Sequence, residues 1–292
     1  MTDSAISPVV TFDFLKDGHY LKMTESGATA YLSADPYPHA VIDDFLPADV
    51  AERAHAEFPG PRDLAWRRQD NERSRKLSTE DLTGIPPYLR SLLESFNTPP
   101  ALDFVERLTG IDGLIPDPYF VGGGLHQIEP GGYLHVHSDF NLHDKLKVDR
   151  RLNLIVYLNK DWKEEYGGHL ELWDRGMTRA VRRVLPVFNR CVIFSTNDDS
   201  YHGHPEKLTA PPGVCRKSLA LYYYSSGRPE AERSARHGTM YQARPEVLRQ
   251  RWTAGRIARK GLSSLLRVVG YALAMPGKLI EKAGKALQPP KF

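Results

Sequence analysis

The sequence predicts an α+β protein in which helices come first and a run of short strands follows. Before residue 110, apolar side chains recur at helical spacing, as in the series Tyr88, Leu92 and Phe96. From Pro118 onward, short apolar stretches alternate with clusters of Gly, Pro, Asn and Asp. This second pattern is typical of a sandwich, barrel or jelly roll, and we expect the preceding helices to buttress one of its sheets.

The N-terminal part is predicted to contain three helices. Residues 1–38 are mostly polar and show no period, so we expect a strand or two there at most. A short strand at 41–45 follows, and Pro47 suits the first turn of a helix. Residues 59–85 are charged and interrupted by Gly and Pro, which predicts mostly loop. The helices are predicted at 47–58, 87–96 and 101–109, the last ended by Gly110.

Six strands are predicted in the second part, at 120–128, 133–138, 151–158, 169–173, 190–195 and 216–225. In the third of these, Asn153, Ile155 and Tyr157 alternate with leucine and valine residues. We expect the leucine and valine face to pack on the helices, which frees the other face to line a pocket. A half-buried strand without a pocket is the alternative.

Length and composition are those of an ordinary soluble protein of 292 residues. No basic N-terminal region leads into an apolar run, and no stretch of 18 uncharged apolar residues occurs. We therefore expect neither a secretory signal nor a transmembrane helix. The two cysteines, Cys191 and Cys215, lie in apolar stretches and predict reduced core thiols in a cytoplasmic protein.

The C-terminal tail is strongly basic. From Arg233 to the end the chain holds 13 Lys or Arg and two Asp or Glu, although the whole chain carries a net charge of only +3. Leu262, Leu266 and Leu273 fall on one face of a predicted amphipathic helix. Three interpretations stay open: packing on the body, peripheral contact with an anionic membrane, and nucleic-acid binding. The last is least favoured because no recognised nucleic-acid module is present.

The candidate chemistry centres on residues 133–141. His137 and Asp139 lie two residues apart, and on an extended strand such side chains project from the same face. An imidazole and a carboxylate supply two ligands of the 2-His-1-carboxylate facial triad that holds Fe(II). Candidates for the third ligand are His202 and His204, which follow the apolar stretch before residue 195. A buried structural histidine is the competing interpretation for each.

Further side chains predict the walls of a pocket around this motif. Arg216 and Ser218 share one strand face, and a guanidinium beside a hydroxyl can clamp a carboxylate. A surface ion pair is the alternative for Arg216. His135 has the parity of His137, so we expect it in the pocket wall. The charged loop at 140–150 is expected to act as a lid or substrate loop, with a plain solvated loop as the alternative.

Taken together, these motifs resemble the prolyl 4-hydroxylase-like Fe(II)/2-oxoglutarate-dependent dioxygenases. The similarity covers roughly residues 118–226, and the motifs occur in the family's order. They are His137-Ser-Asp139, Tyr-Leu-Asn-Lys-Asp-Trp at 157–162, Gly-Gly-His-Leu at 167–170, Phe194-Ser195, His202, and Arg-x-Ser-Leu-x-Leu-x-Tyr at 216–223. The family implies a double-stranded β-helix (jelly-roll) core at 116–228, between a helical support region at 1–115 and the basic helical tail at 229–292.

The resemblance also implies roles for single residues. His137, Asp139 and His202 correspond to the catalytic iron ligands, and His202 is preferred to His204 because it follows the Phe-Ser strand end at about the family's distance. A further tyrosine that contacts the co-substrate in the family has no clear counterpart here, and Gln127 or Tyr133 is the candidate. Arg216, Tyr157, Ser218 and Asn153 are assigned to the binding of the co-substrate 2-oxoglutarate.

The implied activity is hydroxylation of an unactivated C–H bond with release of succinate and CO₂. It requires Fe(II), 2-oxoglutarate and O₂, with ascorbate as a candidate addition. The family-level substrate is a prolyl residue of a peptide or protein; an amino acid, a glycan precursor or another small metabolite is the alternative. Two rival classes are a non-catalytic jelly-roll binding protein and a zinc hydrolase that uses the same ligands.

Overall fold

The computed structural model describes residues 12–79 and 82–246. The chain divides into two compact units, Met1–Gln242 and Ala243–Phe292, and the first contains the elements that build the site. The amphipathic helix predicted around residues 262–273, with its membrane contact, lies outside the described residues. Among the helices of the described segments, none is long and apolar enough to cross a membrane.

Four α-helices occur in the described chain: α1 (Gly18–Leu32), α2 (Ala48–Ala56), α3 (Pro87–Ser95) and α4 (Pro99–Thr109). The last three agree with the predicted helices, and Gly110 ends α4 with a left-handed φ of 68°. The prediction of at most a strand or two in residues 1–38 is wrong. Helix α1 buries only Tyr20, Thr24 and Tyr31, and the small and polar residues between them hide the helical period.

In the described chain, thirteen strands form one sheet whose neighbouring strands are all antiparallel. All six predicted strands are present, with ends shifted by a few residues. The strands are β1 (His39–Ile42), β2 (Arg67–Asp70), β3 (Ser74–Ser78), β4 (Ile115–Pro116), β5 (Gly124–Ile128), β6 (Tyr133–Ser138), β7 (Asp149–Tyr157), β8 (Leu170–Trp173), β9 (Ala180–Val184), β10 (Arg190–Ser195), β11 (His202–His204), β12 (Arg216–Ser225) and β13 (Met240–Tyr241).

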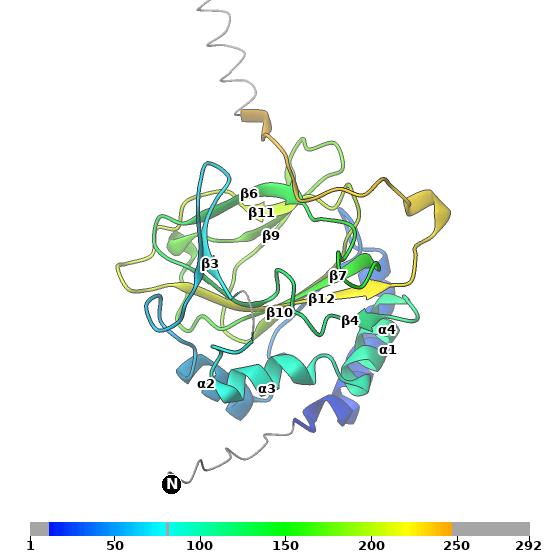
Figure 1. Ribbon diagram of the computed structural model, residues 1–292, viewed down its shortest axis with the longest axis horizontal. Coiled ribbons are helices and arrows are strands. Elements are labelled where there is room, and N and C mark those ends of the chain that lie inside the picture. The colour runs from blue at the N-terminus through cyan, green and yellow to red at the C-terminus, as the bar shows by residue number, and fades with distance from the viewer. Residues whose placement is uncertain (1–11, 80–81, 247–292) are drawn as a thin grey trace, which may run out of the picture. The chain divides into compact units, whose positions relative to one another are not determined.

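The sheet folds over on itself into two layers (Figure 1). Its order is β1-β10-β7-β12-β5-β3-β6-β11-β8-β9, with β13 beside β6, β2 beside β3 and β4 beside β12. Strands β10 and β11 are far apart in this order, yet the rings of Phe194 and His202 lie 4.7 Å apart between centroids. Apolar side chains of β7, β8, β9 and β10 pack together between the layers. This nearly closed antiparallel arrangement is the predicted jelly-roll core.

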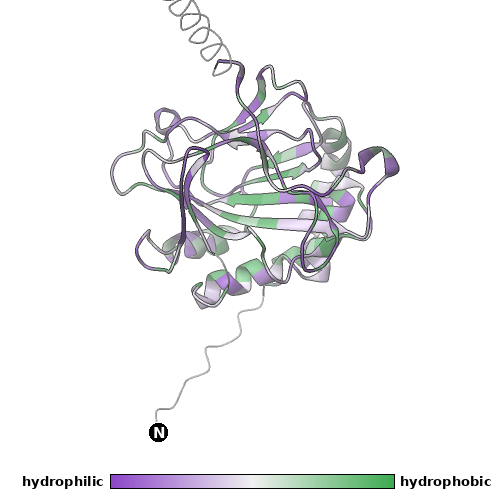
Figure 2. Cartoon of the chain, turned by 45° about the horizontal axis from the view of Figure 1, so that its top comes forward, coloured by the Kyte–Doolittle hydropathy of each residue, from purple (hydrophilic) through white to green (hydrophobic). Residues whose placement is uncertain are grey.

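The helices cover the outer face of the layer that contains β7, β10 and β12 (Figure 1). As predicted, Leu152, Leu154 and Val156 of β7 pack in one buried cluster with residues of the helices, such as Leu89 and Phe104. Hydrophobic strands between hydrophilic loops are visible in Figure 2. The opposite face of β7, with Asn153, Ile155 and Tyr157, therefore points into the space between the layers, where it lines a cavity.

Two segments outside the predicted core strands also join the sheet. Residues 59–85 are mostly loop, as predicted, but they also contain a hairpin of β2 and β3 that the sequence did not predict. Strand β3 pairs with both β5 and β6. Only Leu77 of β3 enters the hydrophobic core, so the charged hairpin shows little alternation in sequence. Residues 229–242, assigned to the tail from the sequence, contribute β13, which pairs with β6.

Candidate active site

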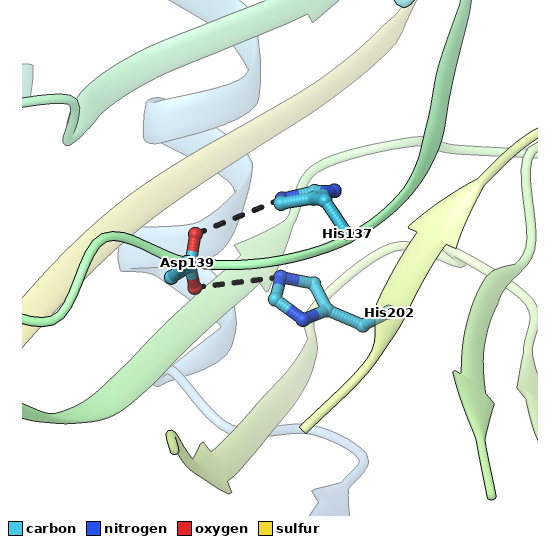
Figure 3. Close-up of side chains that lie close together, drawn as sticks. All are labelled: His137, Asp139 and His202. Atoms are coloured by element: carbon cyan, nitrogen blue, oxygen red, sulfur yellow. Dashed lines mark ion pairs between the residues drawn. The ribbon is translucent and has the colours of Figure 1, made fainter. Parts of the chain in front are cut away.

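His137 and His202 face each other because β6 and β11 pair in that register. Their ring centroids lie 4.5 Å apart. Asp139, just beyond β6, places its carboxylate beside both rings (Figure 3): Oδ1 is 3.6 Å from His137 Nε2, and Oδ2 is 3.5 Å from His202 Nε2. One ligand atom from each residue lies within 4.8 Å of the other two. The fold thus brings together the three predicted ligands as a His–Asp–His cluster.

The hydrogen bonds of His137 and His202 leave Nε2 of each ring available to a metal. Nδ1 of His137 lies 2.9 Å from the His135 carbonyl oxygen, and Nδ1 of His202 lies 2.9 Å from that of Ser200. Because a carbonyl oxygen only accepts, each ring carries its proton on Nδ1 and directs the Nε2 lone pair into the cluster. Two neutral imidazoles and one carboxylate are the donor set of the non-haem Fe(II) facial triad. The residues present therefore fit Fe(II).

The charge states of the cluster also suit a divalent metal. Burial opposes ionisation of Asp139, but Arg150 and the two imidazoles hold the pKa of its carboxyl well below the ordinary value. Burial lowers the pKa of His202 to about 4, although Asp139 acts in the opposite direction. At neutral pH the carboxyl is therefore ionised and the imidazole neutral, the forms that bind metals.

Arg150 and Asn153 both contact the Oδ2 oxygen of the Asp139 carboxylate. Arg150 Nη2 lies 3.1 Å from Oδ2, and Asn153 Nδ2 donates to the same oxygen at 2.8 Å. Arg150 also donates to Asn153 Oδ1 at 2.7 Å and stacks on the Tyr222 ring. The amide of Asn153, assigned to the co-substrate from the sequence, is thus engaged by these two residues. Asp139 Oδ1 is left as the oxygen available to a metal.

The other two histidines of the motifs, His135 and His204, are not part of the cluster, although His204 lines the same cavity. His204 is buried outside the cluster, and in the described chain neither of its ring nitrogens has a hydrogen-bond partner. His135, predicted in the pocket wall, does not line the cavity that holds the cluster. The reason is a bulge in β6: His202 pairs with His137, but His204 pairs with Leu134, so one residue is extra. Leu134 takes the cavity face instead.

A cavity of about 330 Å³ connects the cluster with Arg216. Arg216 is buried, donates from Nε to the Gly168 carbonyl oxygen at 2.8 Å, and donates from Nη2 to the Tyr157 hydroxyl at 3.2 Å. Ser218 pairs with Tyr157 across the sheet and lines the same cavity. A buried guanidinium beside two hydroxyls is suited to a carboxylate. Three of the four predicted co-substrate residues, Arg216, Tyr157 and Ser218, therefore meet in one wall.

Neither candidate for the missing family tyrosine reaches this cavity. Gln127 donates from Nε2 to the Pro59 carbonyl oxygen at 3.0 Å, and the Tyr133 hydroxyl donates to the Asn71 carbonyl oxygen at 2.8 Å. Sequence reasoning also missed several cavity residues. Arg150 carried no sign of burial, β3 was predicted as loop, and β13 was assigned to the tail. Besides Arg150, the missed residues of the cavity wall include Lys76, His126, Tyr222, Thr239 and Tyr241.

Residues 123–224 match the 2OG-Fe(II) oxygenase superfamily. The chain contains an oxygenase domain of this superfamily. The matched segment includes the whole His–Asp–His cluster and Arg216. The predicted family is confirmed, and with it Fe(II) and 2-oxoglutarate as the metal and co-substrate of the family.

The oxygenase domain resembles known prolyl hydroxylases. Prolyl 3-hydroxylase OGFOD1 of Mus musculus is 25% identical over 200 residues, which are 66% of this chain and 34% of the mouse protein. The match thus spans about a third of that relative's length. A Trichoplax adhaerens prolyl hydroxylase, solved with a hypoxia inducible factor oxygen degradation domain peptide fragment, superposes with a TM-score of 0.52. It is 16% identical and covers 73% of this chain and 96% of its own.

A Pseudomonas putida prolyl-4-hydroxylase gives a TM-score of 0.46 at 18% identity, covering 70% of this chain and 99% of its own. At these identities the likeness to solved structures concerns the fold. The Trichoplax structure supports the jelly-roll fold that the sequence predicted.

Proposed function

We propose that this protein is an Fe(II)- and 2-oxoglutarate-dependent dioxygenase that hydroxylates an unactivated C–H bond and releases succinate and CO₂. The observation that carries the proposal is one cavity lined by both the His–Asp–His cluster and the buried Arg216. His137, Asp139 and His202 would hold Fe(II), while Arg216 and Tyr157 would bind the distal carboxylate of 2-oxoglutarate. Fe(II), when bound, supplies with 2-oxoglutarate and O₂ the oxidising chemistry that inserts one oxygen atom into the C–H bond.

The chain's own residues prepare this chemistry. Backbone carbonyls fix the orientation of the His137 and His202 rings, and Arg150 fixes the Asp139 carboxylate. Apolar side chains of Leu134, Ile155, Leu170 and Ala220 also line the cavity. They suit the carbon chain of 2-oxoglutarate and limit the access of water to the reacting atoms.

For the primary substrate we propose a prolyl residue of a peptide or protein. The support is the 25% identity with a mouse prolyl 3-hydroxylase. Proline-containing peptides, incubated with the protein, Fe(II), 2-oxoglutarate and ascorbate, should gain the mass of one oxygen atom per peptide. Oxygen incorporation into free amino acids or sugars, with none into any peptide, would replace the prolyl proposal by the small-metabolite alternative.

The activity itself is tested without knowing the substrate. Wild-type protein with Fe(II) and 2-oxoglutarate should form succinate slowly even without substrate, and Asp139→Ala should form none above background. The matched control is Asp144→Ala, because Asp144 is an exposed carboxylate paired with Arg236 on the surface. Equal succinate formation by wild type and Asp139→Ala would refute the proposed function.

A further inference from the structure

Lys76 places an ammonium group in the wall of the active-site cavity. It lies on β3, where Leu77 enters the hydrophobic core, and Lys76 lines the cavity together with its cross-strand partner Gln69. The proposed function gives no role to this lysine. A lysine directed into a cavity, rather than out to water, calls for a negatively charged partner.

Within residues 12–79 and 82–246, Lys76 makes no hydrogen bond and no ion pair. Two carboxylates near its strand are committed elsewhere: Asp70 pairs with Arg75 at 3.8 Å, and Glu129 pairs with Arg68 at 3.1 Å. Burial lowers the pKa of Lys76 to about 8, and Asp139 opposes this effect. The ammonium is therefore mostly charged at neutral pH while lacking a close counter-ion.

The sheet register sets Lys76 in the same row as Arg216. Leu77 pairs with Gln127, so the next position on each strand brings Lys76 beside Ile128. Ile128 in turn pairs with Arg216 on β12. Two strand spacings separate the Lys76 and Arg216 backbones by about 10 Å. Because both side chains are long and line one cavity, their charged ends can converge on a single small anion.

The charges of the cavity leave room for such an anion. Its lining includes the cations Lys76, Arg150 and Arg216, whereas Asp139 is the one carboxylate among its described lining residues. Arg150 pairs with Asp139. Lys76 lines the same cavity as Asp139 and Arg216, and it interacts electrostatically with both. The dianion 2-oxoglutarate is the ligand of the proposed function that matches this charge.

We infer that Lys76 is a co-substrate-binding residue that contributes a second cation, beside Arg216, to the binding of 2-oxoglutarate. Gln127 and Tyr133, the two candidates from the sequence for a further co-substrate contact, are engaged elsewhere and leave this contact open. This inference rests on the proposed function. An ammonium that reaches a desolvated carboxylate forms a charge-assisted hydrogen bond, which is among the stronger polar contacts in proteins.

The test is direct binding of 2-oxoglutarate, measured by titration calorimetry with Mn(II) in place of Fe(II) and without O₂. Lys76→Met should raise the Kd by about 10-fold or more, as expected for the loss of a charged hydrogen bond. Lys76→Arg should recover much of the affinity. The matched control is Lys217→Met, because Lys217 lies on the other face of β12 with its ammonium 5.3 Å from the Phe58 ring. The Kd of Lys217→Met for 2-oxoglutarate should equal that of the wild-type protein.

A second measurement separates binding from a structural role. At pH about 8, where Lys76 is partly neutral, wild type should take up protons when it binds 2-oxoglutarate, because the bound carboxylate favours the ammonium form. Calorimetry in two buffers of different ionisation enthalpy measures this uptake. In Lys76→Met the uptake should be much smaller. A folded Lys76→Met protein with an unchanged Kd and unchanged proton uptake would overturn the inference.

The same titration separates the two proposals. Failure of the wild-type protein to bind 2-oxoglutarate would remove the proposed function and this inference together. Normal binding by both wild type and Lys76→Met would leave the proposed function intact and remove only the role of Lys76.

Discussion

The guanidinium of Arg150 lies 3.1 Å from Oδ2 of Asp139. A metal that bound this oxygen would have to compete with Arg150 for it. Arg150 is almost fully buried, at 2% exposed, and its guanidinium carbon lies 3.6 Å from the centroid of the Tyr222 ring. Burial of an arginine is costly unless it is paired and stacked, and here both conditions are met. Arg150 therefore acts as a positioning residue that leaves Oδ1 of Asp139 as the oxygen available to a metal.

Arg150→Met should weaken divalent metal binding by about 10- to 100-fold, the usual cost of losing a partner that orients a metal ligand. The measurement is titration of the purified protein with Mn(II) or Co(II). Arg151→Met is the control, since Arg151 donates to Ser225 instead of Asp139. Because Arg150→Met leaves the partly buried Asp139 without its arginine ion-pair partner, circular dichroism must first establish that the variant is folded. Unchanged metal affinity in folded Arg150→Met would contradict the positioning role.

His202 and His204 should respond differently to the same substitution. His202→Leu should abolish high-affinity metal binding, because its Nε2 belongs to the cluster. His204→Leu should retain binding within about 3-fold and leave stability unchanged or improved by about 1 kcal/mol, because it removes two buried ring nitrogens without hydrogen-bond partners. Metal titration and urea unfolding check both expectations. Loss of metal binding in His204→Leu alone would reverse the assignment of the third ligand.

Two adjacent glycines offer a matched test of the Arg216 wall. Gly167 and Gly168 have φ values of 69° and 70°, so alanine strains the backbone at either position. A Cβ on Gly168 would come within 3.0 Å of Arg216 Cδ and 2.5 Å of Leu208, whereas one on Gly167 meets nothing within 4 Å. Gly168→Ala should raise the KM for 2-oxoglutarate by about 10-fold or more. Gly167→Ala should lower the melting temperature but leave this KM unchanged; equal KM values for the two variants would argue against the steric explanation.

His126 should make stability depend on pH. Burial, reinforced by the charge of Lys76, lowers the pKa of the His126 imidazole to about 3. Between pH about 6.5 and 3 the unfolded chain therefore binds a proton that the folded protein does not. The free energy of unfolding should therefore decrease as the pH is lowered through this window. The contribution of His126 is up to about 1.4 kcal/mol per pH unit.

The variant His126→Gln removes the titrating group and keeps a donor for the Gly122 carbonyl oxygen. Its stability should fall less steeply than that of wild type between pH about 6.5 and 4. Urea unfolding at several pH values measures the two slopes. Parallel profiles would show that His126 is accessible to protons in the folded state.

The sequence was sufficient for the residues whose role depends on local spacing. His137 and Asp139 share a face because they lie two residues apart at the end of a strand, and Arg216 and Ser218 do so by the same rule. The helices α2, α3 and α4 followed from apolar period and from Pro or Gly at their ends. Such features depend on neighbours within a few positions, which a sequence displays directly.

Tertiary structure decided the rest, because those features depend on which distant strands become neighbours. The β6–β11 register sets His202, and not His204, opposite His137, and the bulge turns His135 away from the cavity. The pairing of β3 with β5, and of β5 with β12, brings Lys76 into the row of Arg216. Burial of Arg150 depends on Asp139 and Tyr222, which lie 11 and 72 positions away along the chain. A charged side chain is stable inside a fold only beside partners that the fold itself supplies, and local sequence holds no record of them.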